Sequence, residues 1–202
     1  MTVALSAPPL VLRSLDSDWD YTRWEALPAD GYRYEIIAGV LYMTTAPSFF
    51  HQWIIQRLIR LVGIPAEDQG TALFALAPVG LLMPGCDPVP PDFLLVRRER
   101  AAMIRERRIR GVPDLMVEVL SPANHEQDTV IKRGAYARAG VPEYWIIGPA
   151  NRDVLICWQP DSAFGAYVQT QLYGTEDHVS SPTLPITLSV AALFLGSPDE
   201  TL

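Results

Sequence analysis

The chain has 202 residues, 49% of them hydrophobic, and a formal net charge of −7. This length and apolar content suit one domain with a sizeable core, and the acidic balance argues against strong nonspecific binding to nucleic acid. We expect a loose N-terminal arm over residues 1–18, a single domain over 19–196 and a C-terminal tail over 197–202.

The cysteines and the apolar segments favour a cytoplasmic protein. Cys86 and Cys157 match neither a disulfide framework nor a paired-cysteine zinc site. The N-terminal sequence MTVALSAPPLVL lacks a basic region and is interrupted by Pro8 and Pro9, which argues against a signal peptide. No apolar run is long enough to span a bilayer, so we expect no membrane association.

The first half of the chain predicts helices, a hairpin and short strands. The hairpin follows from YRYEIIAGVLYM (32–43), in which Ala38-Gly39 suits a tight turn. An amphipathic helix over 49–62 follows from apolar residues that recur at helical spacing. The other expected elements are a helix at 22–28 and strands at 72–76, 79–83 and 92–97, the last two separated by the turn-rich PGCDPVPP.

A cluster of arginines follows in residues 97–110, RRERAAMIRERRIR, for which we expect a helix. The segment contains seven arginines and only two acids, Glu99 and Glu106, so it carries a net charge of +5 and the remainder of the chain carries −12. Such a run is either a solvated, salt-bridged surface or a ridge that contacts phosphate groups.

The second half predicts a strand, a helix and further strands. The strand covers 114–120 in PDLMVEVLSP, and SPANHEQ opens a helix, capped by Ser121 or Asn124, that ends at Gly140. Strands are expected at 143–148, 154–159 and 166–173, with a short helix, SVAALF, near the end. This order of helices and strands predicts one α/β domain with a mixed sheet.

Three acids lie within strands that otherwise read as core. Glu118 shares one strand face with Met116 and Leu120, which are apolar. An ionised carboxylate is seldom buried there without a partner. Asp92 begins PDFLLV, and Glu35 lies in YEII of the hairpin. Each acid alone is more often a surface residue, but three on neighbouring strands could converge on a hard divalent cation.

Lys132 is the single lysine beside fifteen arginines. Asp128, Lys132 and Tyr136 recur at i, i+4 and i+8, which places them on one helix face. Asp128 and Lys132 either form an ordinary ion pair on the helix surface, or Lys132 points its ammonium toward the acids. In the second case the ammonium would stabilise negative charge that develops on a phosphate.

Several motifs of the chain occur in a characteristic order: YEIIAG, His51 at a helix start, VPPDFLLV, PDLMVEVLSP, the spacing Asp128-x3-Lys132-x3-Tyr136, and GVPEYW. In this set, the chain resembles the Uma-type restriction endonucleases, domain of unknown function family 820. That family belongs to the PD-(D/E)XK nuclease superfamily, and the resemblance covers residues 20–195. It implies an α/β fold with a restriction-endonuclease-like mixed β-sheet core, flanked by helices and carrying extra β-hairpins.

The resemblance also implies roles for particular residues. Asp92, Glu118 and Glu35 match the acids that bind Mg²⁺, for which Mn²⁺ can substitute, and Lys132 completes the catalytic set. The common superfamily pattern places the lysine two residues after the strand acid, where this chain has Leu120, but in the resembled family the lysine comes from the following helix. His51 and Asp128 are expected to support the site from outside the catalytic set.

The implied activity is hydrolysis of DNA phosphodiester bonds by an endonuclease. DNA would then be the partner, with Arg105, Arg107 and Arg108 as candidate contacts, and a homodimer would suit a double-strand cutter. The alternative is a non-catalytic interaction domain that keeps the nuclease fold, which the acidic net charge favours. Glycoside hydrolysis by paired carboxylates is a third class, poorly supported because it needs no lysine.

Overall fold

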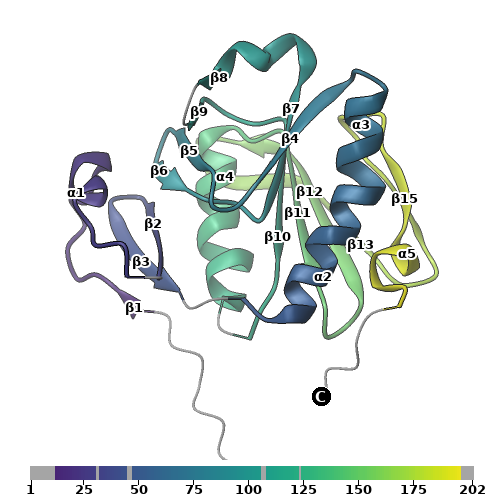
Figure 1. Cartoon of the computed structure of the whole chain (residues 1–202), viewed down its shortest axis with the longest axis horizontal. Coiled ribbons are helices and arrows are strands. Elements are labelled where there is room, and N and C mark those ends of the chain that lie inside the picture. Colours follow the sequence, from purple (N-terminus) through teal and green to yellow (C-terminus); the bar gives the residue numbers. More distant parts are fainter. Residues whose placement is uncertain (1–11, 31, 45–46, 106–107, 123, 197–202) are drawn as a thin grey trace, which may run out of the picture.

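The computed structural model, which describes residues 12–30, 32–44, 47–105, 108–122 and 124–196, centres on a six-stranded sheet in the order β13-β12-β11-β10-β7-β4 (Figure 1). β10 and β11 are parallel, and the other neighbouring pairs are antiparallel, so the sheet is mixed. Its strands are β4 (Ala72–Leu76), β7 (Phe93–Arg97), β10 (Leu115–Val119), β11 (Glu143–Gly148), β12 (Asp153–Asp161) and β13 (Ala166–Tyr173).

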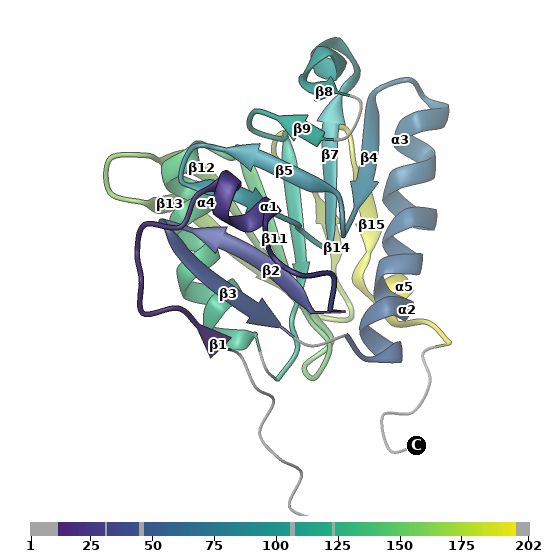
Figure 2. The same cartoon turned by 60° about the vertical axis from the view of Figure 1, so that its left-hand side comes forward.

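Helices cover both faces of this sheet because its central strands are apolar on both sides (Figures 1 and 2). Odd-numbered residues such as Phe93 and Val117 share a core with α2 and α5, whereas even-numbered residues such as Leu94 and Met116 share a core with α4. The helical segments are α2 (Phe49–Leu58), η1 (Ile59–Gly63), α3 (Ile64–Asp68), η3 (Gln127–Lys132), α4 (Arg133–Ala139) and α5 (Val190–Phe194).

A second, seven-stranded sheet packs on the α4 side, in the order β1-β3-β2-β6-β5-β9-β8. Its buried Leu81, Met83 and Val89 join the same core as Met116 and Tyr136. Its strands are β1 (Leu12–Arg13), β2 (Arg33–Ile37), β3 (Val40–Thr44), β5 (Gly80–Met83), β6 (Cys86–Val89), β8 (Ile104–Arg105) and β9 (Arg108–Arg110). The remaining elements are α1 (Tyr21–Glu25), η2 (Arg98–Met103) and the pair β14 (His178–Ser180) and β15 (Thr187–Ser189).

Most predicted elements are confirmed, including the mixed α/β core and the extra hairpins. β2 and β3 pair around Ala38 and Gly39, which have φ values of 51° and 77°, as a tight hairpin turn requires. The helix after β10 ends at Gly140, whose φ of 82° is typical of a left-handed cap.

The helix predicted over residues 97–110 is wrong. A 3-10 helix, η2, covers Arg98–Met103, and β8 and β9 then pair as a hairpin. Ile109 is buried and faces Leu81 across a parallel pairing of β5 and β9. The arginines that flank Ile109 alternate with it, and this period of two is a strand signal that the dense charge concealed.

Two further expectations need correction. PGCDPVPP was expected to be a turn, but Cys86–Val89 forms β6, because Cys86 and Val89 are fully buried between β2 and β5. Part of the expected loose arm is attached to the sheet, since Leu12 and Arg13 form β1 and pair with β3. Residues 1–11 and the tail 197–202 lie outside the described residues. Among the helices described, none is long and apolar enough to cross a membrane.

Candidate active site

Two antiparallel strands bring Asp92 and Glu118 to the same end of the central sheet. Glu118 lies near the end of β10, and Asp92 directly precedes β7, whose Phe93 pairs with Val117. The backbone N–H of Val119 donates to Asp92 Oδ2 at 3.0 Å. The Asp92 carboxylate is therefore fixed beside the strand that carries Glu118.

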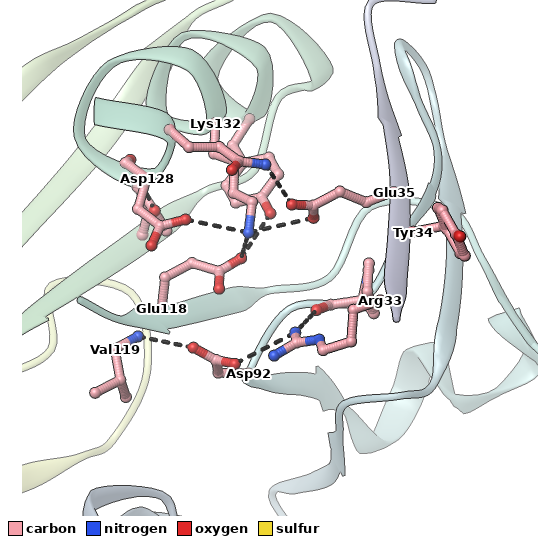
Figure 3. A network of polar contacts seen from close by, with 12 residues as sticks. Arg33, Tyr34, Glu35, Asp92, Glu118, Val119, Asp128 and Lys132 are labelled. Carbon is pink, nitrogen blue, oxygen red and sulfur yellow. Dashed lines mark hydrogen bonds and ion pairs between the residues drawn. The ribbon is translucent and has the colours of Figure 1, made fainter. Parts of the chain in front are cut away.

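Lys132 reaches Glu118 and two further acids from η3. Its Nζ lies 3.0 Å from Glu118 Oε1, 3.1 Å from Asp128 Oδ1 and 3.3 Å from Glu35 Oε2 (Figure 3). Lys132 therefore points to the same side of the sheet as Glu118. π-helical turns such as η3 are rare in proteins, and those that do occur are often found at functional sites.

Glu118 is held through one of its two oxygens. Oε1 accepts from Lys132 and also from the Tyr136 hydroxyl, at 2.8 Å. Within the part of the chain that the structure describes, Oε2 has no hydrogen-bond partner. One carboxylate oxygen of Glu118 thus remains free for a ligand.

Strand β2 closes the site from the second sheet. Glu35 and Arg33 alternate with Tyr34, so they share a strand face, and Figure 3 shows both extending from β2 toward the other acids. The Gln127 amide donates to Glu35 Oε1, and the Arg33 guanidinium lies 3.5 Å from Asp92 Oδ1.

His51 contacts the site directly from the start of α2. Ser48 Oγ caps this helix by accepting from the His51 backbone N–H at 3.2 Å. The ring Nε2 lies 3.0 Å from Asp92 Oδ2. An ionised carboxylate can only accept, so Nε2 carries the proton in this contact. Among the described residues, the other ring nitrogen, Nδ1, is buried without a hydrogen-bond partner.

The charged side chains of the site are buried from solvent, and acids outnumber cations among them. Its four carboxylates and Lys132 are each at most 5% exposed: Glu35, Asp92, Glu118, Asp128 and Lys132. Counted as ionised, the four acids exceed the two permanent cations, Lys132 and Arg33, by two charges when His51 is neutral.

The pKa values of Asp92 and Lys132 favour their charged forms. Burial raises the pKa of Asp92, but the hydrogen bond to His51 and the charge of Arg33 outweigh it and bring this pKa to about 2. Burial lowers the pKa of Lys132, but Asp128 and Glu118 outweigh it and hold this pKa well above its usual range. Both groups are therefore charged at neutral pH.

The pKa values of Glu118 and Asp128 shift the other way. Burial raises the pKa of Glu118 well above its usual range, and the neighbouring acids add to the effect against the charge of Lys132. Burial also raises the pKa of Asp128, to about 6. Strongly perturbed acids in one cluster are typical of functional sites.

The donor chemistry of this cluster fits a hard divalent cation. Carboxylate oxygens are the ligands that Mg²⁺ prefers, and the cluster carries an excess of two negative charges, which matches its charge, when all four acids are ionised. Glu35 Oε2 and Asp128 Oδ1 are buried, and each lies within 3.3 Å of the Lys132 ammonium without a well-directed hydrogen bond among the described residues. Within the same residues, no group of three or more His, Cys, Asp or Glu side chains is already arranged to hold a metal ion. Here the Lys132 ammonium occupies the centre of the cluster.

The arginine-rich segment lies away from this cluster. β7 leads from Asp92 to Arg97, and η2, β8 and β9 follow beyond its far end (Figure 2). Five strand residues span about 17 Å. At that end, Arg100 lies 2.6 Å from Asp114, a second buried acid of the β10 segment.

The three candidate DNA contacts differ in their surroundings. Arg105 is exposed on β8. The Arg108 guanidinium lies 4.6 Å from the ring centroid of Tyr21 and 5.5 Å from that of Trp24, so it stabilises the packing of α1. Arg107 lies outside the described residues.

Three site residues were missed from the sequence. The sequence placed Tyr136 on the helix face of Asp128 and Lys132 but gave it no role; its ring is fully buried, and its hydroxyl donates to Glu118. Its position four residues after Lys132 was the available signal. Arg33 stands two residues before Glu35, so strand alternation could have found it. No pattern pointed to Gln127.

The mixed sheet, with acids and a helix-borne lysine gathered at one end of its central strands, has the restriction-endonuclease-like α/β fold. A family model described as Uma2, "Putative restriction endonuclease", matches residues 19–193, and the chain belongs to this family. The crystal structure of a putative nuclease belonging to DUF820 from Anabaena variabilis ATCC 29413 is similar, with a TM-score of 0.72 and 18% sequence identity. The match covers 87% of this chain and 97% of that chain, and it shows a shared fold. A search of curated proteins gave no significant match.

Proposed function

We propose that the protein is a divalent-metal-dependent endonuclease that hydrolyses DNA phosphodiester bonds. The convergence of Asp92, Glu118 and Lys132 at one end of the central sheet supports this most strongly. Membership in a family of restriction-endonuclease-like proteins supports the reaction class.

Asp92 and Glu118 would hold Mg²⁺ or Mn²⁺, with Glu35 as a further ligand. Asp92 is ionised at neutral pH, and one oxygen of Glu118 has no hydrogen-bond partner among the described residues. A bound Mg²⁺ would supply a water of lowered pKa and polarise the scissile phosphate.

The residues of the chain would position the reacting groups. Lys132, held by Asp128, presents a permanent charge that can orient a water or offset charge on the phosphate. His51 and the Val119 N–H orient the Asp92 carboxylate from two sides. Tyr136 fixes Glu118, so that its free oxygen keeps one direction.

A non-catalytic interaction domain is the second candidate. Two observations favour it: Lys132 is already paired with three carboxylates, and the arginine-rich segment lies at the far end of β7. Against it stands the destabilising effect of so many buried charges, which a domain without catalysis has no reason to retain.

Nicking of supercoiled plasmid in Mg²⁺ or Mn²⁺ tests the proposal. We expect Glu118→Gln to lose at least about a hundredfold in rate with little change in melting temperature, because glutamine mimics the protonated acid. Lys132→Arg keeps the charge but not the compact shape of the ammonium, and should also lose activity. The matched control is Glu143→Gln, a fully buried glutamate at the opposite end of the parallel β10–β11 pairing. Wild-type protein that cuts no DNA with any divalent metal would favour the interaction domain.

A further inference from the structure

A cavity of about 440 Å³ opens beside the acidic cluster. His51 belongs to both, because its ring contacts Asp92 and also lines the cavity. Its other walls come from the loop after β10, which includes Leu120, the loop after β11, which includes Asn151, and His125. The volume lies in the usual range for sites that bind small organic groups.

The register of four strands connects the floor of the cavity to the candidate catalytic acid. Glu118 on β10 pairs with Ile146 on β11, Ile146 with Leu155 on β12, and Leu155 with Leu172 on the edge strand β13. Ile146, Leu155 and Leu172 all line the cavity. A row of apolar side chains therefore runs from Glu118 to the edge of the sheet.

The chemistry of the walls suits an uncharged, flat ligand. The floor is aliphatic, whereas His125, Thr129, Asn151 and the carboxylate of Asp153 offer hydrogen-bonding groups on the walls. No lysine or arginine is among the described residues that line the cavity, so its walls lack the groups that usually bind phosphate. His51 adds a buried Nδ1 with no hydrogen-bond partner among the described residues.

We infer that this cavity binds one unpaired nucleobase of the substrate strand, next to a phosphate placed at Glu118 and Lys132. A base has apolar faces for the aliphatic floor and polar edges for the walls. A base inside a duplex is stacked and paired, so it must leave the duplex to enter a pocket. The inference rests on the proposed function and adds that the preferred substrate carries an unpaired nucleotide.

The test compares two fluorescein-labelled strands of equal charge: a ten-unit thymidine strand and a ten-unit strand of abasic tetrahydrofuran phosphates. Binding is followed by fluorescence anisotropy with Ca²⁺ in place of Mg²⁺. Base contacts in single-strand complexes contribute about 1–3 kcal/mol each, so we expect wild-type protein to prefer the thymidine strand by about fivefold to about 150-fold.

Two variants locate the base contact. Leu172→Glu places a carboxylate on the floor and should abolish the preference for bases. Val168→Glu is the matched control, because Val168 lies on the same strand, is similarly exposed (63% against 61%) and does not line the cavity. It should lower the affinity for both strands equally and keep the preference.

Each remaining outcome has a definite meaning. Equal or undetectable binding of both strands by wild-type protein would overturn the inference, and so would a preference that survives Leu172→Glu. Plasmid nicking without a base preference would contradict the cavity assignment alone. A base preference that depends on Leu172, in a protein that never cuts, would contradict the proposed nuclease activity alone.

Discussion

Lys132 joins acids from three separate parts of the chain through contacts of 3.0–3.3 Å. Glu35 comes from β2, Glu118 from β10 and Asp128 from the same helical turn as the lysine. A buried ammonium is stable only with such partners, and the acids in turn need the ammonium. This mutual dependence explains why the single lysine of the chain stands at this position.

The raised pKa of Asp128 gives the metal-free protein a specific pH dependence. The folded state holds the Asp128 proton up to about pH 6, whereas the ordinary value of 3.8 applies when it is unfolded. Between these values the folded state binds more protons, so the free energy of unfolding should fall as pH rises, by at most about 1.4 kcal/mol per pH unit. Urea unfolding of wild type and Asp128→Asn from pH 4 to 7 measures this. An identical slope in both proteins would contradict the assignment.

The lowered pKa of Asp92 should make the free energy of unfolding rise with pH, opposite to the effect of Asp128. Its pKa of about 2 in the folded protein lies below the ordinary 3.8, so its contribution to stability is present above about pH 4 and is lost as pH falls toward 2. Asp92→Asn should therefore remove part of the acid destabilisation of the wild type below pH 4. Unfolding curves collected from pH 2 to 5 would contradict this if the variant and the wild type lost stability in parallel.

At the scale of elements, the hairpin of β2 and β3 carries Glu35 into the site, and its turn depends on a close approach. Gly39 has a φ of 77°, and a Cβ added there would lie 2.2 Å from the carbonyl oxygen of Ser17. The segment before α1 therefore packs directly on the turn. Trp19 reinforces this contact by donating its backbone N–H to the Gly39 carbonyl at 2.9 Å.

Gly39→Ala should destabilise the protein more than Gly70→Ala. Both glycines have positive φ, so both substitutions introduce about 1 kcal/mol of backbone strain, but a Cβ at Gly70 would meet nothing within 4 Å. The contact with Ser17 should add about 1–3 kcal/mol at Gly39. Equal losses in the free energy of unfolding would show that the segment before α1 is not docked on the turn.

Elements with a clear apolar period were predicted well from the sequence. Segments rich in charged residues or in proline were predicted poorly. The hairpin and the strand of Glu118 were found because apolar alternation and turn residues agreed. The β8–β9 hairpin was missed because a single buried Ile109 stands among arginines, and only its pairing with β5 explains the strand. The acids of the site were found from charges in apolar strands. Gln127 was missed because a glutamine near a helix start has no such contrast.

At the scale of the whole molecule, acidic and basic groups separate along β7. The acidic cluster lies at the start of this strand, whereas the arginine-rich segment begins at its end. Several of those arginines bind within the chain, as Arg100 does with Asp114 and Arg108 with Tyr21 and Trp24. A homodimer, which would place two sites on one duplex, stays a prediction.

Arg105→Ala should leave the salt dependence of binding a short strand unchanged. Arg105 is exposed but stands beyond the far end of β7 from Asp92. Each phosphate contact that is lost lowers the slope of log affinity against log salt by about one unit. A slope reduced by that amount in the thymidine-strand assay would show that the arginine-rich segment contacts phosphate.

We propose that Asp92 and Glu118 hold a divalent cation beside Lys132, and the decisive experiment is a crystal soaked in Mn²⁺. Anomalous scattering locates manganese independently of activity. We expect one peak within ligand distance of a carboxylate oxygen of Asp92 and of Glu118, and we expect this peak to be lost in crystals of Glu118→Gln. Manganese bound only elsewhere, or a peak that persists unchanged in the variant, would contradict it.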